Sequence, residues 1–488
     1  MRVGIIGAGV AGLATAKTLL QAGHEVVVFD SAPDVGGVWS RTRRYPGLTT
    51  QSAKATYGLS DYPMPKEFPE WPTGEQVQSW LESYAHEFKI EPHLRLGVRV
   101  TRAVRSSAGW TLGLSSGPDE TFDKLVVANG VFCEPNMPVF EGQEEFQGEI
   151  LAGTEMHDAS LARGKHVLVV GYGKSACDVT VPLSEVAAST DVIARQLLWK
   201  VPRKIAGVVN FKMLLLTRMG EALFRYHRLR GFEKFLHGPA TPMRRGMLNS
   251  VGSVSVRQFK LKQLGLVPAG TMEGIVKGAI GLATEGFFEG VEAGKIRVHR
   301  DTTIGRLRAG EAELSDGTVL PADLIVCATG FRQGVPFLDS SVQEAIFDER
   351  GNFQLYRQIL PLGVDGLYFN GYNSSFFSPL NAEMAAVWIT AHLAGLVPLP
   401  APEEMRRRVE AQLAFMDEAT DRHHSRGTKI IPFSLKNADE VLDDLGLNIG
   451  RGVRASHWIN PVDPSAYRGV TPALIARLRA RESVLSDA

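Results

Sequence analysis

The sequence predicts an α/β fold with two parallel sheets, in which the second domain is inserted into the first. A short apolar strand at residues 3–6 runs into a glycine-rich turn, a helix over residues 13–22 and a second strand at 25–29. The same order recurs between residues 165 and 194. Units of this kind build parallel sheets covered by helices. Two further apolar strands, within 123–130 and 323–330, end in small residues and mirror each other, so we expect them to carry the chain between the domains.

The glycine turn of the first unit predicts a dinucleotide-binding site. Gly7 permits the tight turn, Gly9 lets the backbone approach a pyrophosphate, and Gly12 lets the helix lie on the strand. The N-terminus of the helix then offers free N–H groups to the phosphates. Asp30 stands at the tip of the second strand, where an acid accepts the ribose hydroxyls. Glycine turns also serve plain packing, but here the strand, the helix and the acid all occur at the expected spacing.

A pair of glycines follows this unit. Gly36 and Gly37, with Val38 and Trp39 after them, suggest a second approach of the backbone to the same nucleotide, with the Trp39 ring covering it. A glycine turn beside a packed tryptophan explains the pattern equally well.

The second unit differs from the first at its tip. Its loop contains Gly171, Gly173, Lys174 and Ser175, and Arg195 follows its second strand. An acid at that tip suits a free ribose 2′-hydroxyl, whereas an arginine pairs with a 2′-phosphate. We therefore expect NADP rather than NAD here, in preference to a solvated surface arginine.

Two complete units imply two nucleotides. The economical pairing is a tightly held FAD on the first unit and a diffusible NADPH on the second, because a flavin accepts a hydride from a nicotinamide and passes electrons onward. We expect a discontinuous FAD-binding domain with a C-terminal extension over residues 1–163 and 305–488, and an NADPH-binding domain with a helical insertion over 164–304. Small residues at the ends of the returning strands are expected beside the nucleotides: Ala128, Thr329 and Gly330.

Composition narrows the class of protein further. Among the 488 residues there are 53 Lys and Arg and 53 Asp and Glu. The chain therefore has no net positive charge that would attract nucleic acid. Three widely spaced cysteines form no C-x-x-C pair and indicate buried thiols in a reducing compartment. The chain starts directly with a strand and holds no apolar run long enough to span a membrane. We expect a cytoplasmic protein, and the sequence leaves open whether it forms a homodimer.

The remaining stretches give weaker signals. A long connection at residues 45–72 contains several aromatics, which favours a functional loop over disorder. Residues 200–288 are apolar and basic with helical character, as in 211–229, and we expect an amphipathic helix that covers a domain rather than one that docks on a membrane or a partner. A helix over about 380–396 starts at Leu380, and its N-terminus is placed to face the anionic side of a reduced flavin.

No metal site is expected. Asp421, His423 and His424 offer metal-ligand chemistry, but adjacent histidines cannot both face one ion from a helix. A solvated turn is the better explanation.

Over nearly its whole length the sequence resembles the flavin-containing monooxygenase family, the class B flavoprotein monooxygenases. The resemblance is carried by the glycine loops at 7–12 and 171–176 and by the motifs at 36–39, 57–65, 199–203 and 328–331. It implies FAD on the first unit, NADPH on the second, and a link between the domains through the Ala-Thr-Gly strand.

The sequence departs from the family pattern in one motif and at two single positions. The identifying motif Phe-x-Gly-x-x-x-His-Ser-x-x-Tyr keeps Phe146 and Gly148 but has other residues at its last three positions, Ala152, Gly153 and Met156, with His157 out of register. Gln51 stands where the family places an asparagine beside the flavin, and Lys174 replaces the asparagine of the second loop. Gln51 keeps the amide, on a longer and less rigid arm.

The resemblance implies the chemistry. NADPH docks on the second unit and reduces the flavin, oxygen adds at flavin C4a, and a soft nucleophile, an amine nitrogen or a sulfur, attacks the (hydro)peroxide in one or in successive steps. A dry pocket, bound NADP⁺ and amide donors protect that species. The residues expected at the reacting centre are Gln51, Ser52 and Asn373, with Tyr57, Ser374, Phe376, Phe377 and Asn381 as further candidates that packing explains equally well.

Two alternatives stay open. A Baeyer–Villiger enzyme acting on a ketone is the nearest, although its usual motif is eroded and no clear arginine follows the flavin loop. An NADPH oxidase or flavin reductase that inserts no oxygen is the rival from another class, because loss of the asparagine at position 51 exposes the peroxide. Disulfide reduction is excluded by the lack of a cysteine pair.

Overall fold

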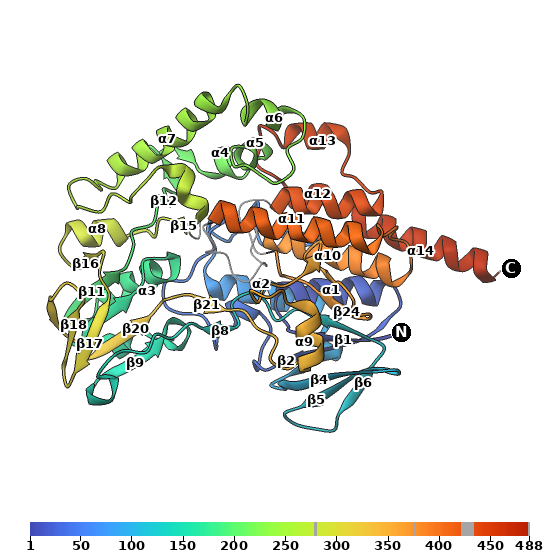
Figure 1. Cartoon of the computed structure of the whole chain (residues 1–488), viewed down its shortest axis with the longest axis horizontal. Helices are drawn as coiled ribbons and strands as arrows, with labels where there is room; N and C mark the ends of the chain where they lie inside the picture. Colours follow the sequence, from blue (N-terminus) through green and yellow to red (C-terminus); the bar gives the residue numbers. More distant parts are fainter. Residues whose placement is uncertain (278–280, 374–375, 421–433, 487–488) are drawn as a thin grey trace.

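The computed structural model (Figure 1) describes residues 1–277, 281–373, 376–420 and 434–486. The expected fold class is confirmed: two parallel sheets, each fed by a glycine turn and a helix, form the two ends of the molecule.

The first sheet has the strand order β24–β7–β1–β2–β3, all parallel. Apart from the edge strand β3, its strands are short apolar runs that are mostly buried on both faces, as is usual for a parallel sheet. The bounds are β1 Arg2–Ile6, β2 Glu25–Asp30, β3 Leu94–Leu96, β7 Lys124–Val127 and β24 Leu367–Phe369. Helices α1 (Val10–Gln21) and α10 (Ser378–Leu393) pack against each other beside this sheet.

The second sheet repeats the plan with the order β16–β11–β10–β20–β9, again all parallel. The bounds are β9 Glu149–Ala152, β10 His166–Val170, β11 Ser189–Ala194, β16 Arg297–Arg300 and β20 Leu324–Cys327. Helices α3 (Lys174–Ser184) and α8 (Phe287–Glu292) pack against each other here. Because β9 and β20 pair in this sheet, we propose that the second domain runs from about residue 149 to about residue 327, wider than the boundaries at 164 and 304.

Two connections join the domains side by side. β8 (Glu134–Pro135) and β21 (Phe331–Arg332) follow the mirrored strands β7 and β20 and pair with each other antiparallel. The Thr329 hydroxyl donates to the Asn136 carbonyl at 2.6 Å, and the Asn136 N–H donates to the Gly330 carbonyl at 2.9 Å. The chain thus crosses between the domains twice at one place.

The insertion after β11 differs from the expectation of a long helix at 211–229. The chain folds there into two short helices, α4 (Lys212–Leu215) and α5 (Arg218–Ala222). They approach so closely that a Cβ on Gly220 would lie 2.3 Å from the Leu214 carbonyl oxygen, so the chain bends between them. Its other elements are β12 Lys200–Val201, β13 Lys204–Ile205, β14 Val209–Asn210, α6 Phe232–Leu236, α7 Thr241–Gln258 and β15 Gly281–Leu282.

The C-terminal extension packs on the insertion and on α10 (Figure 1). It consists of α11 Pro402–Thr420, α12 Ser434–Leu445, α13 Arg451–Ser456 and α14 Val470–Ser486. Arg218 of α5 holds Asp439 of α12 through two hydrogen bonds of 2.6 and 2.8 Å. No helix in the described residues is both long and apolar enough to cross a membrane.

Smaller elements complete the fold. Two antiparallel sheets lie at the edges: β4 Val100–Ser106, β5 Gly109–Leu114 and β6 Glu120–Phe122, and β17 Ile304–Arg308, β18 Glu311–Leu314 and β19 Val319–Pro321. The others are α2 Gly74–Glu87, α9 Ser340–Ile346, β22 Leu355–Tyr356 and β23 Leu360–Pro361.

The long connection at 45–72 is fixed to the first domain by buried polar contacts. Ser60 donates to the buried carboxylate of Glu383 in α10 through its N–H at 2.7 Å and its hydroxyl at 2.6 Å. Lys17 of α1 is fully buried and pairs with Asp61. The loop is therefore held over the two helices that flank the first sheet.

Candidate active site

A cleft of about 2250 Å³ runs from the first glycine loop to the second. Both loops line it, together with the tips of β2 and β11 and the two connections between the domains. One drug-sized ligand occupies roughly 300–1,000 Å³, so this cleft has room for two dinucleotides.

The first glycine loop presents bare backbone to the cleft. Gly7 has φ +115°, and a Cβ there would lie 2.4 Å from the Ala128 carbonyl oxygen. A Cβ on Gly12 would lie 1.8 Å from the Gly7 carbonyl oxygen, so only glycine lets α1 approach the loop this closely. Gly9, which lines the cleft, lies in contact with Gly37 of the paired-glycine turn.

Asp30 lines the cleft at the end of β2. Its carboxylate accepts the Ala8 N–H at 2.7 Å and the Ala32 N–H at 2.8 Å, which fixes its orientation. Burial raises the pKa of Asp30, while these two hydrogen bonds and the nearby Arg43 act in the opposite direction. A carboxylate has about four acceptor positions, so two remain for ribose hydroxyls.

The segment after Gly36 forms a short 3₁₀ turn, Gly37–Trp39, whose three residues all line the cleft. Trp39 is mostly buried, and its indole N–H donates to the Tyr57 hydroxyl at 3.2 Å. Burial raises the pKa of Tyr57 to about 12, so the phenol keeps its proton at neutral pH. Trp39 therefore both packs under the loop and holds Tyr57 at the cleft.

The second glycine loop has the same geometry as the first. Gly171 has φ +127°, and a Cβ there would lie 2.6 Å from the Ala328 carbonyl oxygen. Gly173 lines the cleft and caps α3, whose first two residues, Lys174 and Ser175, also line it. The Ser175 hydroxyl accepts a hydrogen bond of 2.9 Å from Tyr45 of the first domain.

Lys174 is buried rather than extended into the cleft. Its ammonium pairs with Asp178, one turn later on α3, and Thr284 donates to the same carboxylate oxygen. Burial lowers the pKa of Lys174 and raises that of Asp178, and the attraction between the two opposes both shifts. The second oxygen of Asp178 has no hydrogen-bond partner in the described structure.

Arg195 lies directly after β11, exposed and on the cleft. Its guanidinium makes no hydrogen bond or ion pair with the residues that the structure describes. It is thus a free cation at the tip of the second unit.

Gln51 and Ser52 lie on the cleft at a contact between the domains. The Gln51 amide oxygen accepts the Leu282 N–H at 3.3 Å, and its neighbour Thr49 accepts a 2.9 Å hydrogen bond from Arg203. The Ser52 hydroxyl donates to the Phe376 carbonyl at 2.7 Å, so this hydroxyl fixes the loop. The amide NH₂ of Gln51 makes no hydrogen bond to the described residues.

Asn373 lies on the same wall. It is buried, its amide nitrogen donates to the Asn381 oxygen at 3.2 Å, and Asn381 donates to the Phe377 carbonyl at 3.0 Å. This chain fixes the orientation of the Asn373 amide and leaves its oxygen without a donor in the described structure. Ser374 lies outside the described residues.

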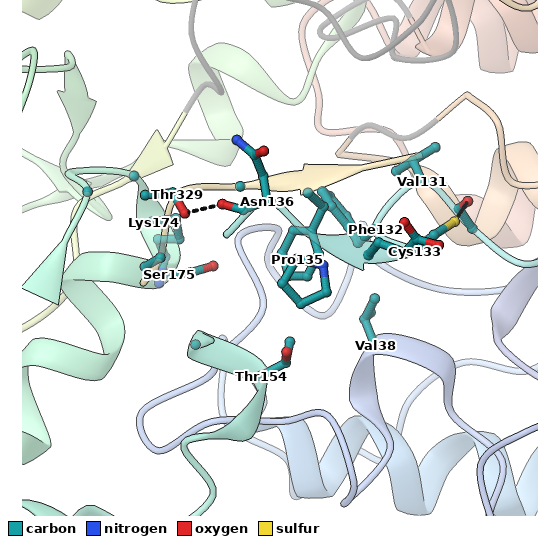
Figure 2. A pocket seen from close by; sticks show the side chains of 18 of the residues that line it. Val38, Val131, Phe132, Cys133, Pro135, Asn136, Thr154, Lys174, Ser175 and Thr329 are labelled. Atoms are coloured by element: carbon teal, nitrogen blue, oxygen red, sulfur yellow. Dashed lines mark hydrogen bonds between the residues drawn. The ribbon is translucent and has the colours of Figure 1, made fainter. Parts of the chain in front are cut away.

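The residues between the domains separate the two halves of the cleft. Figure 2 shows Lys174, Ser175 and Thr329 on one side of the pocket and Val38 on the other, with Phe132 and Pro135 between them. Ala128 and Gly330, at the ends of the mirrored strands, line the cleft as well.

Four of the predicted residues that the structure describes do not line the cleft: Gly12, Leu380 and the further candidates Phe377 and Asn381. Gly12 is covered by the glycine loop, and the Leu380 side chain is fully buried in α10, which starts at Ser378. Any cofactor contact of Leu380 stays a prediction about its backbone. Among the described residues no group of His, Cys, Asp or Glu is arranged for a metal, and Asp421, His423 and His424 lie outside them.

Some residues that line the cleft were not predicted from the sequence. Arg43 lines the cleft, half-buried, and donates to the Phe132 carbonyl. Phe224, Arg225 and His227 of the insertion line it too, opposite Phe415 of α11. Burial lowers the pKa of His227 to about 4, so this side chain is neutral at physiological pH. These residues follow no motif, and only the contact between the insertion and α11 brings them to the cleft.

The site fits two dinucleotides. Two glycine loops, each beginning with a glycine that has no room for a Cβ, face one cleft, an acid ends the strand beside the first, and a free arginine ends the strand beside the second. Backbone N–H groups at a helix start are suited to phosphates. This fold and site define a two-nucleotide oxidoreductase.

Comparison with known proteins identifies the family. The sequence profile of the flavin-binding monooxygenase-like family matches residues 1–236. The probable indole-3-pyruvate monooxygenase YUCCA9 of Arabidopsis thaliana is 30% identical over 375 residues, which cover 75% of this chain and 83% of the relative. The dimethylaniline monooxygenase [N-oxide-forming] 2 of Oryctolagus cuniculus is 26% identical, covering 92% of this chain and 82% of the relative.

Solved structures agree on the fold. The S-allyl-L-cysteine S-oxygenase of Allium sativum superimposes with a TM-score of 0.64 at 20% identity, covering 99% of this chain and 98% of that one. The chain belongs to the flavin-containing monooxygenase family. It is an FAD-dependent NADPH monooxygenase, as the sequence predicted.

Proposed function

We propose that this monooxygenase uses NADPH and O₂ to oxygenate a soft nucleophile of a small molecule, an amine nitrogen or a sulfur, in one step or in successive ones. The observation that carries the proposal is the uncharged wall formed by Gln51, Ser52, Tyr57, Asn373 and Phe376. An amine or a thioether is itself the attacking group, so the protein needs no charged side chain to activate it. The printed names of the rabbit and garlic proteins, an N-oxide-forming enzyme and an S-oxygenase, support this class.

The first domain is proposed to hold FAD. The Gly7–Gly9 backbone and the start of α1 would bind its pyrophosphate, Asp30 its ribose, and the Gly37–Trp39 turn would cover it from the other side. When bound, the flavin accepts the hydride of NADPH and activates dioxygen. The protein would bind the cofactor and the substrate, orient them, and exclude water.

The second domain is proposed to hold NADPH. Gly171, Gly173 and the N–H groups of Lys174 and Ser175 face the cleft and would bind the pyrophosphate. Arg195 would pair with the 2′-phosphate, because its exposed guanidinium makes no hydrogen bond or ion pair with the described residues and can bind a phosphate through two N–H groups. The Lys174 side chain would act indirectly, by holding the first turn of α3 through Asp178.

Gln51 is proposed as the amide donor of the reacting centre. Its oxygen is held by the Leu282 N–H of the second domain, which turns its NH₂ group away from that contact. The donor is thereby positioned by a contact between the domains, which compensates for an arm longer than that of asparagine. Ser52 and Asn373 are proposed to fix the same wall rather than to react.

A Baeyer–Villiger reaction is less well supported. Attack on a ketone builds negative charge, which a nearby cation has to stabilise. None of the five residues of the uncharged wall is a Lys or an Arg, and Arg203, which contacts Thr49, is already paired with Glu285. Ala152 lies in β9 opposite Cys327, and Met156 is fully buried, so neither replaces the missing motif histidine or aromatic.

The proposal is tested with a panel of substrates. The flavin-loaded protein is incubated with NADPH and, separately, with N,N-dimethylaniline, methyl phenyl sulfide or cyclohexanone, and products are identified by mass spectrometry. We expect an N-oxide or a sulfoxide and no lactone. Lactone alone would establish the Baeyer–Villiger reaction, and hydrogen peroxide without any oxygenated product would favour the oxidase.

A further inference from the structure

The helical insertion carries a surplus of positive charge, although the chain as a whole has no net charge. Residues 201–275 contain 13 Lys and Arg but only three Glu and no Asp, a surplus of ten positive charges, and five of these cations pair with acids from outside the stretch. Since the whole chain has 53 residues of each sign, the rest of the molecule carries the balancing negative charge. The basic side chains Lys204, Arg228, Lys234, Arg245 and Arg257 of this stretch are exposed.

Exposed apolar side chains gather on the same stretch. Val208 at the β13–β14 turn is 80% exposed, and Met213 and Leu214 on α4, Phe232 and Phe235 on α6, and Met243 and Met247 on α7 are each more than 40% exposed. Figure 1 places α4, α6 and α7 along one outer edge of the molecule, with α13 beside them. The exposed apolar side chains thus lie on the β13–β14 hairpin and on three helices of the insertion.

The centre of this edge is an aromatic cluster that we call the α6 surface: Phe232, Phe235, Trp458 and Ile459. The Phe232 ring lies 5.7 Å from that of Phe235 and 6.0 Å from that of Trp458, centroid to centroid. Ile459, next in the chain, is 74% exposed. Lys234 on α6 and Arg451 on α13 are exposed on the two helices that meet here, and neither pairs with an acid among the described residues.

The positive charge of the insertion indicates which kind of partner binds the α6 surface. A second copy of this chain docking by the same edge would bring two sets of surplus positive charges together, which disfavours a symmetric dimer. Apolar and aromatic side chains that protrude among Lys and Arg match the boundary of an anionic lipid layer, where rings enter the headgroup region and cations meet phosphates.

We propose that the α6 surface and the basic insertion around it dock this enzyme reversibly on anionic membranes. The sequence favoured a helix that covers a domain, and the insertion does cover the cleft with Phe224 and Arg225. Its opposite edge is the one that faces the lipid. The docking needs neither substrate nor nucleotide, and it is therefore independent of the reaction assigned above.

The test is co-sedimentation of the full chain with vesicles. Vesicles of phosphatidylcholine alone are compared with vesicles in which about a quarter of the lipid is phosphatidylglycerol, at low and at high salt. We expect binding to the anionic vesicles at low salt, loss of binding at high salt, and little binding to the neutral ones. Each Lys or Arg near such a surface contributes about fivefold in affinity, so Lys234→Glu with Arg451→Glu should weaken binding at least about 25-fold.

Matched control variants show whether a loss of vesicle binding is specific to the α6 surface. Phe232→Ser with Ile459→Ser should abolish most of the binding, whereas Val319→Ser, an apolar residue 52% exposed on β19, should not. Lys66→Glu with Arg479→Glu reverses two exposed charges elsewhere and should change binding less than threefold. Thermal unfolding checks that each variant is folded.

Equal loss in the control variants, or no binding to anionic vesicles at low salt, would overturn the proposal. Sedimentation velocity without vesicles adds a second readout. A mass that halves in the Phe232→Ser with Ile459→Ser variant would assign the surface to a homodimer instead.

Discussion

We propose that Arg195 determines the choice between NADPH and NADH. Its guanidinium is free at the tip of β11, and hydrogen bonds to a charged group contribute about 1.5–3 kcal/mol. We expect Arg195→Ala to raise the Kd of NADPH roughly 10- to 150-fold and to leave the Kd of NADH unchanged, as measured by nucleotide fluorescence. Arg257→Ala, an exposed arginine on α7, is the control. Equal effects on both nucleotides would remove Arg195 from the phosphate site.

At Lys174 the sequence and the structure lead to different roles. The motif position suggested a cofactor contact, but the side chain is buried against Asp178. The spacing of four residues on one helix was a readable signal for that pair. The burial of the pair could not be predicted from the sequence, because Thr284 contacts the pair from a distant segment.

The buried pair makes a stability prediction. Asp178→Leu leaves the Lys174 ammonium buried without its partner, which costs roughly 3–5 kcal/mol. Lys174→Met with Asp178→Leu removes both charges and should recover most of the loss. The thermal midpoints of the two variants measure this. A double variant no more stable than Asp178→Leu alone would show that the pair is not the source of the cost.

At the scale of elements, the start of α12 is held by a buried acid. Glu221 of α5 accepts the N–H groups of Leu435 and Lys436 at 3.2 and 3.4 Å. Burial raises the pKa of Glu221 to about 8, against the opposing effects of Lys436 and Arg218. The folded state therefore keeps a proton that the unfolded chain releases near its ordinary pKa of 4.5.

This proton gives the stability a defined dependence on pH. Because the folded state binds the extra proton, stability falls as pH rises between about 4.5 and about 8. Glu221→Gln keeps an acceptor and removes the titration, so its thermal midpoint should match that of the parent protein near pH 4.5 and exceed it near pH 8.5. The exposed Glu289→Gln is the control. An unchanged pH slope in Glu221→Gln would assign the slope to other groups.

Some helices could be predicted from the sequence and others could not. Glycine loops and their helices follow from local rules, so the helix expected at 13–22 appears as α1 and the one expected at 380–396 as α10. The stretch 211–229 has helical periodicity, but the chain bends between α4 and α5, where a Cβ on Gly220 would lie 2.3 Å from the Leu214 carbonyl oxygen. Periodicity carries no information about that contact.

On the scale of the whole molecule, the order of the domains followed from two repeated units, while the strand membership of the second sheet did not. β9 precedes the glycine unit and joins the sheet only by pairing with β20. The wall formed by the insertion and α11 is likewise a product of tertiary contact, so Phe224 and Phe415 had no motif to reveal them. Local sequence rules predicted the residues on the cofactor side of the cleft. The residues of its outer wall could be identified only from the tertiary structure.

The central claim is that the cleft couples NADPH oxidation to insertion of oxygen into a soft nucleophile. The most direct measurement supplies ¹⁸O₂ and a limiting, measured amount of NADPH to the flavin-loaded protein with methyl phenyl sulfide or N,N-dimethylaniline, and counts labelled oxygen in the product and hydrogen peroxide in solution. The account predicts one ¹⁸O atom in product for each NADPH consumed, with little peroxide. Stoichiometric peroxide and unlabelled substrate would contradict it.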